Sequence, residues 1–410
     1  MLMFTRKKKQ SHSTENSTEQ PLEASEGPKT LDALFTSLAD QIDNTPVGEG
    51  KKNPGIQKKQ PWFKRNKKLA IILAIVGVLL IGAATAGALW YFNQKDDTPQ
   101  VATKKEEPKP EPVKYYSPLT GNLVADEAAT KQAVTAIMIE NSPDARPQSG
   151  LKDSGVVFEA IAEGGITRFL VLYQQEKPAL IGPVRSLRMY YVDWLAAFNA
   201  SVAHVGGSAA ALDEVRGGNY RDIDQFFNAG TYWRASDRYA PHNVYTNFER
   251  LDALNAAKGF TTSEFTGFAR KDSAANPAPT ATGVNVTISG PLFNSAYTYN
   301  AETNTYDRQQ AGAAHVDRES GQISPRVVIV MRMQETTVLE DGYRQAITTI
   351  GSGSAVIFQD GIAQEVTWHK PSRAEQITFT DAAGAPVSLA RGQTWITAIP
   401  ENKGGKVTWQ

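Results

Sequence analysis

Cysteine is absent from this 410-residue sequence. Its absence excludes disulfide bonds, thiolate metal sites and a cysteine nucleophile. A lipid-modified N-terminal cysteine is excluded as well, so we expect the membrane anchor to be a stretch of the chain itself. A folded region without disulfides depends on its hydrophobic core, and the roughly 300 residues after Pro112 are enough to form one or two cores.

Net charge is also absent, because Lys+Arg and Asp+Glu are equal at 43 each. The charges are unevenly distributed, since residues 58–68 include six basic residues and no acidic one. An apolar run follows this basic stretch, and attraction to anionic lipid is sufficient to explain the charge there. No other stretch is as densely basic, so we predict no nucleic-acid partner.

The apolar run covers residues 69–92 and contains no charged residue. Its 24 residues rise about 36 Å as a helix, enough to cross a hydrocarbon core of roughly 30 Å. We predict a transmembrane helix that spans the cell membrane once. The basic flank favours a cytoplasmic N-terminus and an extracellular C-terminal domain. The long tail before the run disfavours a signal peptide, although small residues at 85–88 leave late cleavage as an alternative.

Residues 1–68 are polar and basic, which predicts a disordered cytoplasmic tail. Within it, residues 30–42 place five apolar side chains on one helical face. This short amphipathic helix could dock a cytoplasmic partner or lie on the membrane, and it could equally be a frayed helix without a partner. Residues 93–114, rich in Pro, Lys and Glu, predict a semi-extended stalk.

The remaining chain predicts an α+β fold in two lobes. Strand and helix patterns alternate over residues 115–260, which predicts an α/β-like first lobe. Residues 261–282 are rich in Ala, Ser, Thr and Pro and are interpreted as a linker. From residue 283 to 410 the pattern is a series of short strands with Gly and Asn turns, which predicts a mostly antiparallel β lobe.

Two carboxylates lie on a predicted hairpin, VVFEAIAE followed by ITRFLVLY, with Gly164 and Gly165 as its turn. The simplest register pairs Glu163 with Ile166 and Glu159 with Leu170. It places both carboxylates and Arg168 on one face of the sheet. Such a group could provide an acid and a base, but a structural ion-pair network would have the same sequence.

Arginines accompany these carboxylates and suit an anionic ligand. The predicted anion contacts are Arg146, Arg168, Arg185 and Arg188. We also expect a helix to begin after Ser186, with Ser186 as its N-cap.

The string His204-Val205-Gly206-Gly207-Ser208 precedes a predicted helix. With Ser208 as the N-cap, the amides of residues 207–209 would point outward and could bind an anion. The string is neither G-x-S-x-G nor a P-loop, so an N-cap role for Ser208 competes with a nucleophilic one.

Asp222 and Asp224 alternate onto one face of an extended segment, and His242 with Asn243 follow downstream. Together with His204 they could bind a metal, but no ligand-spacing motif supports this, and buried hydrogen bonding is the competing explanation. We therefore predict no metal and no cofactor. The residues that could carry acid–base catalysis are Glu159, Glu163, His204 and Asp224.

Several strings, in this order, resemble the YerB-like family of bacterial envelope proteins, whose two-part domain has no assigned function. In the first lobe they are Glu140-Asn141, residues 145–151, residues 162–169, residues 181–186 with Arg188, residues 204–208 and residues 240–243. In the second lobe they are Tyr306, Arg308, Gly312, His315, Asp317 and residues 394–396. The resemblance implies N- and C-terminal subdomains outside the membrane. Family members such as YerB resemble lipoproteins, whereas this chain has a helix in place of the lipid-bearing cysteine.

Three functions remain open at this stage, and the sequence does not decide whether the protein is an enzyme. The first is binding of an anionic or glycan envelope ligand, such as cell-wall glycan, through the arginines, His242 and Asn243. The second is a hydrolase or transferase acting on cell-wall polymer. The third is an envelope scaffold that reaches a cytoplasmic partner through residues 30–42.

Overall fold

The computed structural model describes residues 67–93, 112–338 and 344–410. The chain divides into two units, Met1–Glu107 and Pro108–Gln410, which we treat separately. The predicted amphipathic helix 30–42, nearly all of the predicted tail 1–68 and most of the predicted stalk 93–114 lie outside the described residues.

Helix α1 (Lys67–Asn93) is the described part of the first unit. It contains the whole apolar run that predicted a transmembrane helix. Residues Ile71–Asn93 are long and apolar enough to cross a membrane, and no other described helix meets that test. This finding rests on length and composition and leaves the orientation of the chain as a prediction.

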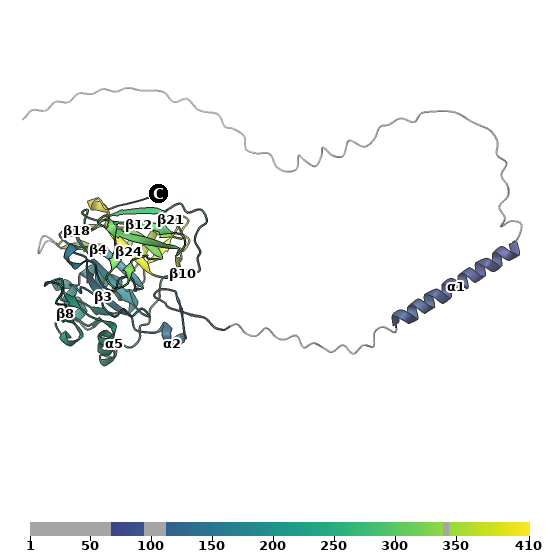
Figure 1. The fold of residues 1–410 in the computed structure, drawn as a ribbon, viewed down its shortest axis with the longest axis horizontal. Helices are drawn as coiled ribbons and strands as arrows, with labels where there is room; N and C mark the ends of the chain where they lie inside the picture. The colour runs from purple at the N-terminus through teal and green to yellow at the C-terminus, as the bar shows by residue number, and fades with distance from the viewer. Residues whose placement is uncertain (1–66, 94–111, 339–343) are drawn as a thin grey trace, which may run out of the picture. The chain divides into compact units, whose positions relative to one another are not determined.

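The second unit is built on a ten-stranded mixed sheet (Figure 1). In spatial order its strands are β22 (Thr378–Thr380), β21 (Ile362–Lys370), β20 (Gly351–Gln359), β17 (Val327–Met333), β24 (Thr394–Pro400), β4 (Val156–Glu163), β5 (Ile166–Tyr173), β3 (Thr135–Glu140), β6 (Ser201–Ala203) and β7 (Arg221–Asp222). The first lobe supplies β3 to β7 and the second lobe supplies the others. The parallel pairing of β24 with β4 joins the two lobes into one sheet.

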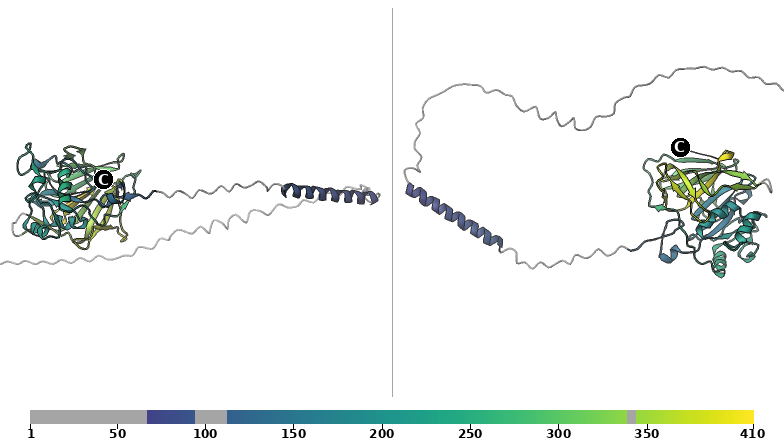
Figure 2. Two further views of the ribbon diagram at one scale, coloured as in Figure 1. Left: turned by 90° about the horizontal axis from the view of Figure 1, so that it is seen from below. Right: turned by 180° about the vertical axis from the view of Figure 1, so that it is seen from behind.

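Among the described residues of this unit, the four α-helices all come from the first lobe. They are α2 (Glu127–Thr130), α3 (Met189–Leu195), α4 (Ala209–Arg216) and α5 (Phe248–Ala257). The second lobe adds a five-stranded antiparallel sheet: β14 (Ala313–Ala314), β13 (Thr305–Gln310), β12 (Ser295–Asn300), β11 (Gly283–Thr287) and β25 (Lys406–Trp409). The prediction of an α+β fold with a mostly β second lobe is confirmed, and Figure 2 shows the unit from two further sides.

Short paired strands complete the unit. They are β1 (Tyr115–Tyr116) with β2 (Leu123–Val124), β8 (Trp233–Arg234) with β9 (Val244–Tyr245), β10 (Arg270–Lys271) with β23 (Leu389–Ala390), β15 (Val316–Asp317) with β16 (Gly321–Gln322), and β18 (Glu335–Thr337) with β19 (Gln345–Ile347). The pair β8 and β9 matters below, because the loop between them bears part of the candidate site.

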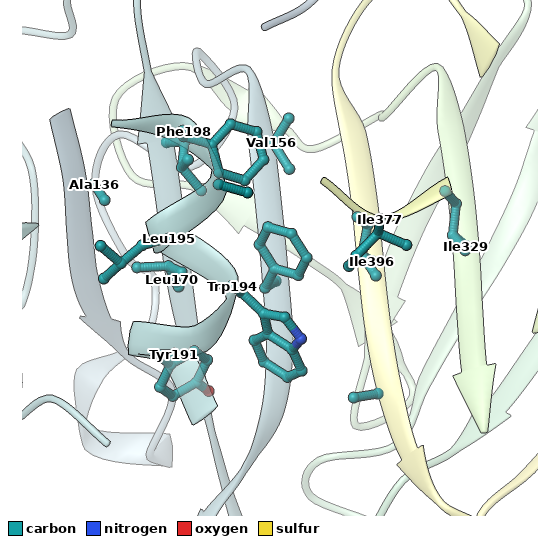
Figure 3. Packing of buried hydrophobic residues seen from close by; sticks show 14 of the residues in the cluster. Ala136, Val156, Leu170, Tyr191, Trp194, Leu195, Phe198, Ile329, Ile377 and Ile396 are labelled. Carbon is teal, nitrogen blue, oxygen red and sulfur yellow. The ribbon is translucent and has the colours of Figure 1, made fainter. Parts of the chain in front are cut away.

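Two hydrophobic cores lie on opposite faces of the large sheet, because successive strand residues point to opposite sides. Phe158 and Leu170 belong to one core, and Val157 with Val171 to the other. Helix α3 covers the first face, where Figure 3 shows Trp194 among the side chains of this core. The Trp194 ring stacks on that of Phe158, with 5.2 Å between the ring centroids. The five-stranded sheet and α5 contribute to the second core.

The predicted hairpin forms with its turn at Gly164 and Gly165, both at positive φ, but the predicted register is only partly correct. Glu163 pairs with Ile166 as expected. A bulge between Ile161 and Glu163 then shifts the pairing, so that Glu159 faces Phe169 rather than Leu170. A bulge inserts one residue and reverses the alternation of side chains beyond it. The expectation that Glu159 and Glu163 share a face is therefore wrong.

One expected helix start also differs. Ser186 does not cap α3, whose N-cap is Arg188, because Leu187 forms a parallel bridge with Gly207 and keeps the chain extended. Helix α5 is capped by Asn247, whose side chain accepts a hydrogen bond from the Arg250 amide.

Candidate functional site

The predicted site residues occupy four places in the second unit. These are Glu159; Glu163 with Arg168 and Arg188; His204 with Gly206, Gly207, Ser208 and Asp224; and Arg146 with Arg185, His242 and Asn243. Of the four predicted catalytic residues, His204 and Asp224 lie together, with 3.8 Å between His204 Nδ1 and Asp224 Oδ1, whereas Glu159 and Glu163 lie elsewhere. The catalytic roles of all four remain predictions.

Glu159 lies in a fully buried polar network between the two lobes. Its Oε2 accepts hydrogen bonds from Arg308 Nη2 at 2.9 Å and from Trp395 Nε1 at 3.0 Å. Its Oε1 lies 3.3 Å from the hydroxyl of Thr167. Burial would lower the pKa of Arg308, but the neighbouring Glu159 and Tyr297 outweigh it and the pKa is raised.

The same network continues through His315. This ring lies against Arg308 on one side, and its Nε2 contacts Gln148 Oε1 at 3.0 Å on the other. Burial, Arg308 and Arg146 lower the pKa of His315 well below its usual value. The neutral ring therefore accepts from Arg308 at Nδ1 and donates to Gln148 at Nε2. We call Glu159, Thr167, Arg308, His315, Trp395 and Gln148 the buried network.

Glu163 is held by two arginines at the end of β4. Arg168 Nη2 lies 2.6 Å from Oε1, and Arg188 Nη2 lies 2.7 Å from Oε2. Burial would raise the pKa of Glu163, but these arginines outweigh it and the pKa is lowered. Both arginines also donate to main-chain carbonyls, Arg168 to Ser186 and Arg188 to Leu187. This arrangement matches the ion-pair alternative that the sequence left open.

His204 and Asp224 brace the loop before α4. His204 is fully buried, with Nδ1 2.8 Å from the Gly206 carbonyl and Nε2 3.0 Å from Asp222 Oδ1. Asp224 is also fully buried; it accepts from the Gly206 amide and pairs with Arg216 at 2.8 Å. Burial would raise the pKa of Asp222, but the bond from His204 leads to a lowered value. Within the described residues, no group of three or more His, Asp or Glu is placed to hold a metal ion.

Ser208 is the N-cap residue of α4, but its side chain makes no capping hydrogen bond. Its amide donates to the Leu187 carbonyl at 3.1 Å, so it does not point outward as expected. Ser208 and Arg188 instead line a pocket of about 410 Å³. The wall of that pocket includes Val338 and Arg344. Residues 339–343 between them lie outside the described chain, so we propose no site in this pocket.

The fourth place contains a surface groove of about 620 Å³. Its lining residues are Asp144, Arg146, Pro147, Asp237, Arg238, Tyr239, His242 and Arg318, and we call it the polar groove. Two loops of the first lobe form its walls, one after β3 and one between β8 and β9. Arg318, which follows β15, brings the second lobe to its rim.

His242 connects the polar groove to a buried carboxylate. Its Nδ1 lies 2.9 Å from Oε1 of Glu140, the last residue of β3. Arg185 Nε and Ser142 Oγ lie 3.2 Å and 2.9 Å from the same oxygen. Glu140 is only 3% exposed, and its second oxygen Oε2 has no hydrogen-bond partner in the described part of the chain.

Further contacts hold the walls of the polar groove in place. Arg238 donates to the carbonyls of Asp144 at 2.9 Å and Pro147 at 2.6 Å, which ties one loop to the other. Arg318 pairs with Asp237 at 2.5 Å. Asn243 does not line the groove; it accepts from Arg234 and closes the loop between β8 and β9.

Arg146 links the polar groove to the buried network. Its Nε and Nη2 donate to Asn141 Oδ1 at 3.2 Å and the Asn141 carbonyl at 2.8 Å. Gln148, a member of the buried network, donates to the same Oδ1 at 2.9 Å. Burial lowers the pKa of Arg146. Strings from both lobes that carried the family resemblance therefore meet in one continuous set of hydrogen bonds that opens at the groove.

Sequence reasoning did not predict Glu140 as a site residue, which contacts His242 from behind the groove. It also did not predict several residues that line the groove: Asp144, Pro147, Asp237, Arg238, Tyr239 and Arg318. Glu140 gave one usable signal, since it is the only charged residue of the apolar strand TAIMIE. The others lie in polar loops, where nothing in the sequence distinguishes them from ordinary surface residues.

Comparison with known proteins agrees with this architecture. Residues 119–261 match the family model described as "Protein of unknown function (DUF3048) N-terminal domain", and residues 284–396 match the corresponding C-terminal domain. A Bacillus subtilis (strain 168) protein named "Putative lipoprotein YerB" is 30% identical over 314 residues, which cover 75% of this chain and 90% of the relative.

The crystal structure of the YerB protein from Bacillus subtilis superimposes with a TM-score of 0.64 at 27% sequence identity, covering 72% of this chain and 99% of that one. The chain therefore belongs to the YerB-like DUF3048 family, with a two-part α+β domain. The family relationship predicted from the sequence strings is confirmed.

Proposed function

We propose that this protein is a single-pass membrane protein that displays its folded unit outside the cell and binds an anionic or glycan envelope polymer, such as cell-wall glycan, in the polar groove. Helix α1 would be the anchor, with the basic flank at 58–68 on the cytoplasmic side. The lipoprotein name of the Bacillus subtilis relative supports a place at the membrane surface.

The observation that carries the binding proposal is the chemistry of the groove. Tyr239 is 91% exposed beside arginines and aspartates, so an aromatic face and paired charged groups are available to one ligand. Ligand sites typically combine such a contact surface with a few fixed polar groups. Guanidinium groups suit carboxylates and phosphates, and Arg146 and Arg238 are held in place by main-chain carbonyls.

Binding is tested with the full-length protein in detergent micelles and purified wall polymer, by co-sedimentation at low and high salt. We expect binding that weakens as salt rises. Tyr239→Ala should weaken it about tenfold, which corresponds to about 1.4 kcal/mol. Phe226→Ala is the matched control, because Phe226 is also an exposed loop aromatic (67%) but does not line the groove. Absence of binding at low salt would contradict the proposal.

The orientation is tested by adding protease to intact cells. The proposal expects digestion of the folded unit while a tag placed before residue 58 stays protected. Protection of the folded unit, with no shed form in the medium, would show that it does not face outward.

A further inference from the structure

We propose that the polar groove also hydrolyses acyl esters carried by its polymer ligand, with His242 as the catalytic base and Glu140 as the residue that positions it. This inference rests on the proposed function, because the same groove would hold the ester. It assigns acid–base chemistry to His242, which the sequence selected only as a ligand contact, and to Glu140, which the sequence did not select as a site residue.

The first observation is the orientation of the His242 ring. Its Nδ1 lies 2.9 Å from the Glu140 carboxylate, which can only accept a hydrogen bond. The proton of the neutral ring is therefore on Nδ1, and the lone pair is on Nε2. The residue lines the groove, and Asp144 Oδ2 lies 3.9 Å from Nε2, too far for a hydrogen bond. The lone pair is thus available to a substrate or to water.

The second observation is the incomplete hydrogen bonding of Glu140. Its side chain is almost fully buried, yet Oε2 has no partner within the described chain. Arg185 Nε lies 3.2 Å from Oε1 but makes no hydrogen bond with it. Buried polar groups in a purely structural role are normally satisfied, as Glu159 is. A buried carboxylate with a free acceptor oxygen behind a groove histidine suits a positioning role. Its attraction to the ring strengthens when the ring takes up a proton and becomes charged.

The nucleophile that fits this geometry is water. Ser142 Oγ lies 3.2 Å from Nδ1 of His242 and donates to Glu140, so it is on the wrong side of the ring to be activated by Nε2. A serine nucleophile would have to contact the nitrogen opposite the one bound to the carboxylate. Water in the groove, next to Nε2, has no such restriction.

The number of acid–base groups in the groove indicates which type of bond can be hydrolysed there. Glycoside hydrolysis generally uses two carboxyl groups that flank the bond. Of the two aspartates that line the groove, Asp237 is already paired with Arg318 at 2.5 Å. An acyl ester needs only one histidine, because the attacking and the departing oxygen are both attached to the same tetrahedral carbon.

In the proposed ester hydrolysis, His242 Nε2 takes up one proton and later returns it. His242 Nε2 takes a proton from water while the water oxygen bonds to the ester carbonyl carbon, and the C=O electron pair moves to the carbonyl oxygen. The guanidinium of Arg146 in the groove lining stabilises this oxyanion. The oxyanion collapses, the bond from carbon to the alcohol oxygen breaks, and the imidazolium returns its proton to that oxygen. The products are a carboxylic acid and an alcohol.

The test measures acetate release from O-acetylated wall glycan by the full-length protein in detergent micelles, with polymer binding measured on the same samples. His242→Gln should lower acetate release at least 100-fold, which is far more than it weakens polymer binding measured on the same samples. His369→Gln is the matched control, because His369 is a partly buried histidine on β21 that bonds Thr380. It should stay within about twofold of wild type.

Glu140→Gln tests positioning. Its amide would donate to Nδ1 and move the ring proton to Nε2, so acetate release should fall about 100-fold and its pH profile should change. Glu140 contacts His242 directly, and this substitution alters none of the other charged groups around the ring, which are Arg185 behind Glu140 and Asp144, Arg146, Asp237, Arg238 and Arg318 in the groove. Thermal unfolding of each variant, with His242→Asn as a second substitution, separates loss of chemistry from loss of fold.

Acetate release by wild type that does not exceed the buffer rate, or equal release by wild type and folded His242→Gln, would overturn the esterase inference. Binding that persists in that case would leave the proposed function standing. Loss of binding in wild type would instead contradict the proposed function.

Discussion

The folded unit contains two Glu–Arg–His groups with opposite properties. In the buried network, Glu159, Arg308 and His315 are all fully enclosed and contact one another or neighbouring side chains. Beside the polar groove, Glu140 lies near both Arg185 and His242, and the His242 ring lines the groove. One carboxylate oxygen there lacks a partner in the described chain.

The difference shows that residue type alone does not identify a functional site. The buried network, whose hydrogen-bonding atoms are paired, fixes the two lobes against each other, since Glu159 is in β4 and Arg308 in β13. The group beside the groove has hydrogen-bonding atoms left for a ligand. The following predictions are arranged to separate these two roles, beginning with the largest effect.

Removing one member of the buried ion pair should have the largest effect on stability. Arg308→Met leaves Glu159 buried and unpaired, so we expect the free energy of unfolding to fall by about 3–5 kcal/mol. Urea unfolding of the full-length protein in detergent measures this change. Arg308→Met combined with Glu159→Leu should recover much of the loss, and a double variant as unstable as the single one would argue against an ion-pair role.

Replacing the buried histidine should cost more stability than replacing the groove histidine. His315→Ala removes a fully buried ring and the partners of Arg308 and Gln148, so we expect a loss of about 2–4 kcal/mol. His242→Ala leaves Glu140 with Ser142 and Arg185 nearby, so we expect about 1 kcal/mol. Equal losses in urea unfolding would remove the distinction between the buried network and the groove.

Glu163 predicts a dependence on pH. Its pKa is lowered in the folded protein by Arg168 and Arg188 in spite of burial, so its ionised form stabilises the fold at pH values above its ordinary pKa of 4.5. That contribution is lost as the pH falls through the lowered folded-state pKa. Between pH 6 and the acid end of the titration, wild type should lose about 1–2 kcal/mol more stability than Glu163→Gln. Parallel unfolding curves for the two proteins across this range would contradict the assignment.

Tyr239→Ala should have the smallest effect on stability. Because the side chain is exposed, we expect a change within about 0.5 kcal/mol of wild type. The same variant should show the clear loss of polymer binding described above, and Phe226→Ala should show neither effect. A large loss of stability in Tyr239→Ala would mean that its binding defect cannot be attributed to the groove.

Local sequence signals predicted a good part of the fold. The apolar run, the hairpin turn at Gly164 and Gly165, and the change from mixed to mostly β structure are visible in residue order. The bulge after Ile161 is not visible in residue order. The position of Glu159 depends on Arg308, a partner 149 residues away. A one-residue shift is enough to move a carboxylate from one face of a sheet to the other.

The site was less predictable than the fold for the same reason. Arg146 and His242 were selected from the sequence, and both line the groove. Glu140 was not selected as a site residue, although it contacts His242 across 102 positions of sequence. This contact forms because the loop between β8 and β9 packs against the loop after β3, and local sequence patterns do not reveal such packing.

The most direct test of ligand binding in the polar groove is a crystal structure of the protein with a bound wall-glycan fragment. We predict that the fragment lies in the polar groove, with a sugar ring against Tyr239 and a polar group within hydrogen-bond distance of His242 Nε2. A fragment bound elsewhere on the folded unit, with the groove unoccupied, would contradict it.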